Sequence, residues 1–172
     1  MPISEALIRL VLSHALHEMG NEDEANRELV AAKGAVMQTG SFYFEYLCCL
    51  TEAYFEYARE NEGAGLEALR KAMALGRQKG FTTLLYFWRP AVLVRLCEKA
   101  LEAGMEVAYV QNLIRRLNLV PDERSMEIES WPWHLKIFTL GRFEIRVDGK
   151  PVQFSGKVQK KPLLLLKALI AL

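Results

Sequence analysis

The sequence of 172 residues lacks the hydrophobic segments that direct proteins into or across membranes. Its C-terminal apolar run, residues 163–172, is interrupted by Lys167, whereas a membrane helix needs about 20 apolar residues. The N-terminal apolar stretch has no basic segment before it and no small-residue cleavage site, so we expect no signal peptide. The sequence therefore predicts a protein that does not associate with membranes.

Cysteine is also scarce. The three cysteines are Cys48, Cys49 and Cys97, with no Cys-x-x-Cys spacing. Adjacent cysteines rarely form a disulfide with each other, so the pattern favours a reducing, cytoplasmic location. Within an apolar helix, Cys48 and Cys49 are expected to pack as small residues and not to act as nucleophiles.

Catalytic motifs are missing. Gly149-Lys150 and Gly156-Lys157 lack the earlier glycine of a phosphate-binding loop, and no Gly-x-Ser-x-Gly is present. His14 and His17, with Glu18, could be imagined as metal ligands, but without a cysteine or third histidine the spacing favours surface or groove residues. His134 has no evident partner. We expect no enzyme, no catalytic residue, no cofactor and no metal site.

The net charge is only +1, but the charge is unevenly distributed. From Trp133 onward there are eight Lys or Arg and two acidic residues, whereas the earlier part has more acidic than basic residues. This asymmetry predicts two units with different partners.

Up to about residue 119, the apolar residues recur at intervals of three and four, as they do in amphipathic helices. Glycines and a proline divide this part into predicted helices at 3–19, 24–38, 42–61, 65–78, 89–104 and 105–119. Asn21 with Glu24 resembles a capping pair for the second helix, and Ser41 could cap the third.

The predicted helices form a repeat. Ala15 matches Ala53 at an offset of 38, whereas Leu29 and Ala32 match later residues at an offset of 40. Helix pairs at this period are typical of tetratricopeptide-like solenoids; an irregular bundle is the alternative. An aromatic cluster could line a ligand groove, although core packing is favoured: Phe42, Tyr43, Phe44, Tyr46, Tyr54, Phe55 and Tyr57.

After the helices, the periodicity ends in an acidic segment with two prolines. The predicted domains are a helical repeat region at 1–118, a linker at 119–132 and a second unit at 133–172. Two indoles would be costly to expose to water, so Trp131 and Trp133 are expected to pack where the two units meet or to cover the edge of the following sheet.

In the second unit the period changes to two. Residues 135–140, 142–147 and 150–154 alternate as strands, and Asp148-Gly149 is a strong hairpin signal. A helix is predicted from Pro162. The fold class is thus mainly α: tetratricopeptide-like antiparallel helix pairs (an α-solenoid), then a small antiparallel β-meander and one helix.

Three lysines precede this last helix. Lys157, Lys160 and Lys161 could contact DNA phosphates together with backbone N–H groups at the start of the helix. The alternative is a solvated turn that keeps the apolar helix soluble.

The strands and the residues after them resemble a known family. "TLGRFEI", an "R-x-DG-x-P-V" hairpin and "SGKVQKKPLLLLKALI" are similar to the start of the OmpR-type winged helix-turn-helix domain of bacterial transcription factors. The closest likeness is to antibiotic regulatory proteins and large LuxR/MalT-like regulators. The helical region followed by "WPW" loosely resembles the part that precedes this domain in such regulators.

The resemblance implies a transcriptional regulator whose helical repeats bind a protein or small-molecule effector and whose winged-helix domain binds DNA. The sequence stops inside the first helix of that domain, so we expect a fragment without the recognition helix. Its exposed C-terminal helix could mediate self-association. The alternative is a helical-repeat adaptor that mediates protein–protein interactions without binding DNA.

Overall fold

The computed structural model describes residues 2–84, 87, 89–121, 128–139, 143–153, 164–166 and 168–169. It divides into two compact units, Met1–Trp131 and Pro132–Leu172. The first is helical, and the second holds a small sheet and a short C-terminal helix, so the predicted mainly helical fold class is confirmed.

Six helices form the first unit, close to the predicted positions. Their bounds are α1 Pro2–Glu18, α2 Glu22–Thr39, α3 Phe42–Ala58, α4 Glu62–Lys79, α5 Pro90–Glu102 and α6 Val107–Leu117. Pro90 occupies the first turn of α5, where its missing N–H removes no helical hydrogen bond. Helix α4 begins three residues earlier than predicted, because Gly63 and Gly65 belong to its first turn.

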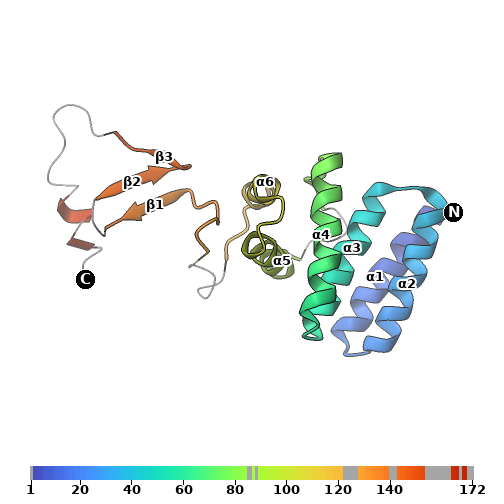
Figure 1. Cartoon of the computed structure of the whole chain (residues 1–172). Helices are drawn as coiled ribbons and strands as arrows, with labels where there is room; N and C mark the ends of the chain where they lie inside the picture. The colour runs from blue at the N-terminus through green and yellow to red at the C-terminus, as the bar shows by residue number, and fades with distance from the viewer. Residues whose placement is uncertain are drawn as a thin grey trace. The chain divides into compact units, whose positions relative to one another are not determined.

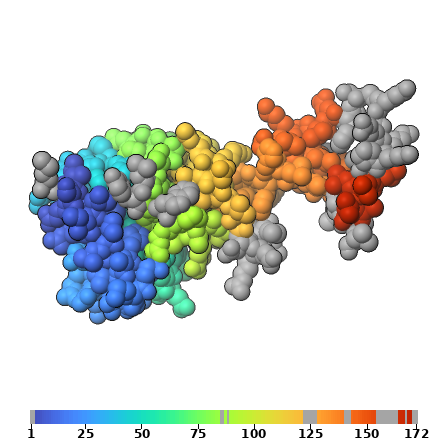
Figure 2. Space-filling view, turned by 180° about the vertical axis from the view of Figure 1, so that it is seen from behind, coloured from blue at the N-terminus to red at the C-terminus, as the bar shows by residue number. Residues whose placement is uncertain are grey.

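The helices pack as successive antiparallel pairs, α1 with α2, α3 with α4 and α5 with α6 (Figure 1). The first helices of neighbouring pairs also touch, α1 with α3 and α3 with α5. In the space-filling view, the first pair forms one end of the helical unit (Figure 2). This stacking buries apolar faces that no single pair could cover.

The first two pairs repeat at an offset of 40 residues in both helices, because α3 begins and ends 40 residues after α1, and α4 does so after α2. The offset of 38 that sequence matching gave for Ala15 and Ala53 is therefore wrong. The residue equivalent to Ala53 is Ser13, and both are fully buried. Matching small residues misaligned the helices because Ala15 lies on the exposed face of α1.

The predicted side-chain caps are also wrong. Neither Asn21 nor Ser41 makes a side-chain capping bond. The backbone N–H of Asn21 instead donates to the carbonyl of Leu16, and Asn61 repeats this bond with Glu56. Each asparagine thus closes the preceding helix before the next one begins, and Glu24 pairs with Arg27 along the surface of α2.

A buried pair of tyrosines ties α3, α6 and the segment after α4 together. The Tyr109 hydroxyl donates to the carbonyl of Phe81 at 2.6 Å and lies 3.1 Å from the Tyr46 hydroxyl. Tyr109 fits there only because α4 has Gly76, where a Cβ atom would overlap the phenol ring. The close approach of α4 and α6 therefore depends on a residue without a side chain.

The second unit contains an antiparallel sheet of β1 Leu135–Phe138, β2 Glu144–Val147 and β3 Lys150–Pro151, in the order β1-β2-β3. Asp148 and Gly149 both have positive φ, at 50° and 77°, as a two-residue hairpin turn with the right twist requires. Strand β3 is shorter than the predicted 150–154. Residues 164–166 and 168–169 are helical.

We predict opposite effects of alanine at two helical glycines. Gly76→Ala forces Tyr109 to move and should lower the free energy of unfolding by about 1–3 kcal/mol. Gly34→Ala, at an exposed site of α2 with open space around it, should raise it by about 0.5–1 kcal/mol because alanine favours the helix. Urea unfolding followed by circular dichroism measures both. Equal effects would contradict the packing of Tyr109 on Gly76.

Candidate interaction surfaces

A cluster of polar side chains joins α1, α3 and the start of α5. Arg89 lies 2.6 Å from a carboxylate oxygen of Glu18, and the Tyr54 hydroxyl donates to the same oxygen at 2.9 Å. The Arg89 guanidinium also lies over the ring of Tyr54, 5.5 Å from its centroid. Each charged group in the cluster thus has a partner, and the cluster acts as a clamp between helix pairs.

His14 lies beneath this clamp, and its hydrogen bonds define its tautomer. The Thr51 hydroxyl donates to the carbonyl of Leu47, so it accepts from His14 Nε2, 2.9 Å away. His14 Nδ1 then accepts from Arg89, at 3.4 Å. Burial, followed by the charge of Arg89, lowers the pKa of His14 to about 4. His14 is therefore neutral at physiological pH and stabilises the helix packing.

His17 packs against aromatic rings, with its ring stacked on Phe55 at a centroid distance of 4.3 Å. Burial lowers its pKa as well. The structure thus puts His14 and His17 in the α1–α3 interface, and the described residues include no group of three His, Cys, Asp or Glu side chains that could hold a metal.

Three of the seven aromatic residues of the cluster on α3 are buried, three are half-buried and one is exposed. Phe44, Tyr46 and Phe55 are buried, whereas Phe42 is 50% exposed. Tyr43 donates to the carbonyl of Thr83, so the segment after α4 lies against α3. The three buried rings agree with the core-packing interpretation of the sequence.

The cysteines are free thiols. Burial raises the pKa of Cys48 and Cys97 to about 12 and also raises that of Cys49. A thiol with a raised pKa carries little thiolate and is a poor nucleophile. Cys48 and Cys97 serve as small packing residues.

Two faces of the sheet differ in chemistry. The register pairs Lys136 with Arg146 on one face, and Leu135 with Val147 and Ile137 with Ile145 on the other. On the basic face, Arg146 forms an ion pair with Glu144 and lies over the ring of Phe138. At one end of the hairpin, His134 Nδ1 lies 2.8 Å from a carboxylate oxygen of Asp148.

The two tryptophans fall in different units. Trp131 ends the first unit and is 2% exposed. Gln111 of α6 donates to the neighbouring carbonyl of Ser130 at 2.8 Å, so this segment is anchored to α6. Trp133 is half-buried in the second unit. Lys157, Lys160 and Lys161, the predicted phosphate contacts, lie outside the described residues.

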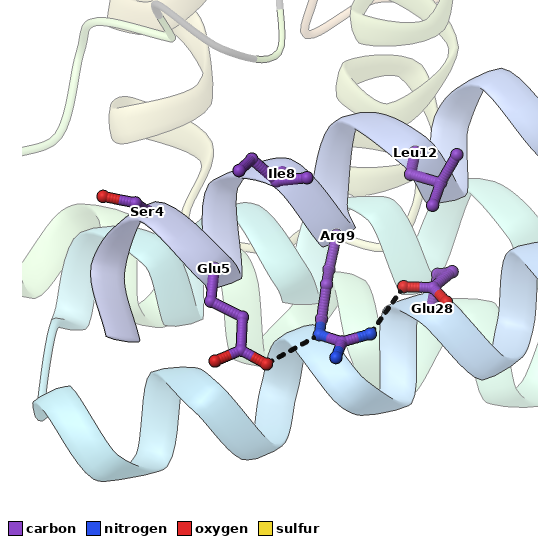
Figure 3. Close-up of a pocket in the computed structure, with 6 residues that line it drawn as sticks. All are labelled: Ser4, Glu5, Ile8, Arg9, Leu12 and Glu28. Atoms are coloured by element: carbon purple, nitrogen blue, oxygen red, sulfur yellow. Dashed lines mark hydrogen bonds and ion pairs between the residues drawn. The ribbon is translucent and has the colours of Figure 1, made fainter. Parts of the chain in front are cut away.

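Helix α1 lies at the end of the helical unit away from α6, and it carries an apolar surface that sequence analysis did not identify. Ile8 is 65% exposed, Val11 53% and Leu12 43%. Beside them is a pocket of about 480 Å³ lined by Ser4, Glu5, Ile8, Arg9, Leu12 and Glu28 (Figure 3). Arg9 bridges Glu5 and Glu28 at 3.0 and 2.9 Å, so the charges at the rim are paired.

The sequence contained a signal for this surface. Helix α1 carries apolar residues on all sides, more than a helix with one buried face needs. Val11, Ala15 and Met19 are exposed, whereas Ala6 and Leu10 are buried.

No protein-family profile, curated protein or solved structure matches this chain. In the part of the chain that the structure describes, no helix has both the length and the hydropathy to cross a membrane.

We predict that His14 makes stability depend on pH. Its pKa is about 4 in the folded protein and about 6.5 when unfolded, so between these values the unfolded chain binds more protons. The free energy of unfolding should fall as pH decreases from 6.5 to 4, by up to about 1.4 kcal/mol per pH unit.

Urea unfolding at a series of pH values tests this. His14→Gln should flatten much of the slope, with the remainder due to His17 and Glu18, whose pKa values are also lowered in the folded protein. An unchanged slope in His14→Gln would contradict the assignment.

Proposed function

We propose that this chain belongs to a bacterial transcriptional regulator, in which a helical-repeat region for protein or effector binding precedes the start of a winged-helix DNA-binding domain. The observation that carries the proposal is the order of elements after Trp131. A three-stranded antiparallel meander is followed by helical residues at 164–166 and 168–169, the order expected from the resemblance of "TLGRFEI" and the Asp-Gly hairpin to the OmpR-type domain.

The chemistry of the sheet is compatible with this role. Its apolar face carries Ile137 and Ile145, both half-buried, with the more exposed Leu135 and Val147 beside them. An amphipathic helix that follows the sheet would cover such a face. Exposed leucines at 164, 165 and 169 supply apolar surface of this kind.

The helical repeats suit a scaffold and not a catalyst. The ionisable residues Glu18, Tyr54 and Arg89 bond to one another. Burial raises the pKa of the Cys48 and Cys97 thiols, which lowers their reactivity. What the first unit offers to other molecules is surface. In the regulator, binding of an effector or protein partner to the helix pairs would change how the DNA-binding domain is presented.

The exposed apolar surface on α1, formed by Ile8, Val11 and Leu12, favours a second candidate function. This candidate is a helical-repeat adaptor that binds proteins and not DNA. The surface fits a protein partner, and a role in DNA binding does not require it. One experiment separates the two functions.

The regulator proposal expects a helix-turn-helix after Leu172, and we predict that a gene product extended by such a segment binds duplex DNA. Binding should weaken by about 10³–10⁵ between 50 and 200 mM salt if six to ten phosphates are contacted. Fluorescence anisotropy at several salt concentrations measures it. A failure to bind DNA at any salt concentration would favour the adaptor.

Two triple variants refine the test. Replacing Lys157, Lys160 and Lys161 by Gln should weaken binding and reduce the salt slope by as many as three phosphate contacts. Replacing the exposed Lys71, Arg115 and Arg116 of the helical unit by Gln removes the same charge and should leave the slope unchanged. Equal losses in both would indicate nonspecific attraction.

A further inference from the structure

We propose that the exposed stripe of α1 is the interface of a twofold dimer in which α1 packs antiparallel against α1 of a second copy. The stripe consists of Ser4, Ile8, Val11, Leu12 and Ala15 of α1 and of Met19 directly after it, all exposed. Most of these residues follow each other at intervals of three or four, so they lie along one side of the helix as a seam that a second helix can cover.

The repeat shows that this side of the helix is built for packing. Forty residues later, α3 uses the equivalent side to dock on the first pair: Cys48 and Phe55 are buried there, and Thr51 bonds to His14. Cys48, Phe55 and Thr51 correspond in α1 to Ile8, Ala15 and Val11, in that order. In α3 these positions are covered by the preceding pair, whereas in α1 they face solvent.

Charge argues against a second copy that simply extends the solenoid. Docking of α3 on α2 uses two ion pairs, Glu52 with Lys33 and Arg59 with Glu22. The positions equivalent to Glu52 and Arg59 are Leu12 of α1 and Met19 directly after it, which are 43% and 73% exposed. If a second copy docked a surface like that of α2 on α1, the residues equivalent to Lys33 and Glu22 would face apolar side chains. They would lose water without gaining a partner, which is costly.

The other end of the helical unit is unsuitable for a second reason. There the segment that ends in the buried Trp131 is anchored to α6 through Gln111. A head-to-tail stack of two copies would have to displace it, so contact between two α1 surfaces is favoured over that arrangement.

The stripe is complementary in size to its own antiparallel copy. In a register centred between Val11 and Leu12, the large Ile8 faces the small Ala15 of the second copy, and Met19 faces Ser4. Val11 and Leu12 meet at the twofold axis. Alternation of large and small residues is what close helix packing requires, and a twofold interface needs such self-complementarity. At the rim, Arg9 is held by Glu5 and Glu28, so both carboxylates of the pocket have a basic partner.

Sedimentation velocity of the whole chain over roughly a hundredfold range of concentration tests the proposal. We expect a reversible monomer–dimer equilibrium. Ile8→Lys and Ala15→Glu should each weaken the dimer at least about tenfold. The double variant should recover most of the affinity, because the introduced lysine of each copy then faces the introduced glutamate of the other. A chain that stays monomeric throughout overturns the proposal.

Two controls isolate the interface. Val30→Lys alters an equally exposed valine on α2 (63%) and should leave the dimer intact. Leu165→Lys with Leu169→Lys tests the C-terminal helix, which is also exposed and apolar. If that variant abolishes association and Ile8→Lys does not, the dimer forms through the C-terminal helix and the α1 interface is wrong. If the double charge variant fails to recover affinity, the antiparallel register is wrong.

Discussion

Close approach between helices is the constraint on which the helical unit depends. Each pair has an apolar face too wide to cover by itself, so successive pairs must come close enough to exclude water. Small buried residues make this possible: Ser13, Ala53 and Cys97 are each 0% exposed on the first helices, and Ala32 and Ala72 are equally buried on the second. Larger side chains at these positions would separate the helices. Gly76 extends the same logic to α6, where it admits the ring of Tyr109 and with it the bond to Phe81.

With the backbones held this close, burying a polar group between the pairs is costly unless a partner satisfies it. His17 Nδ1 is buried without a hydrogen-bond partner among the residues that the structure describes, whereas some other polar groups there are satisfied. His14 is an example: its two ring nitrogens meet Thr51 and Arg89, and the neutral tautomer satisfies both. His14 and His17, whose spacing resembles that of a metal-binding pair, thus contribute to helix packing. Their low pKa values follow from burial and do not indicate catalysis.

Much of this fold was predictable from the sequence, because helix ends, strand alternation and the Asp-Gly turn depend on local interactions. Residues 90 and 148–149 lie where their chemistry requires. The registration of the repeat was not predictable from small residues alone, since Ala15 is exposed and Ser13 is the true equivalent of Ala53. Which side of α1 is buried also depends on where α2 and α3 lie, and a helix that is apolar all round does not encode that choice. The clamp of Glu18, Tyr54 and Arg89 joins residues up to 71 positions apart, which local patterns cannot reveal.

The two ends of the helical unit differ in the residues that they expose. At the α6 end, a tryptophan is buried and its segment is anchored by a side-chain hydrogen bond. At the α1 end, the positions that carry ion pairs in α3 have become Leu12 and Met19. A solvent-exposed end would favour charged residues there, and a continuing solenoid would favour the ion pairs. Apolar residues at both positions favour neither, and instead favour an apolar partner surface, which the antiparallel copy of α1 provides.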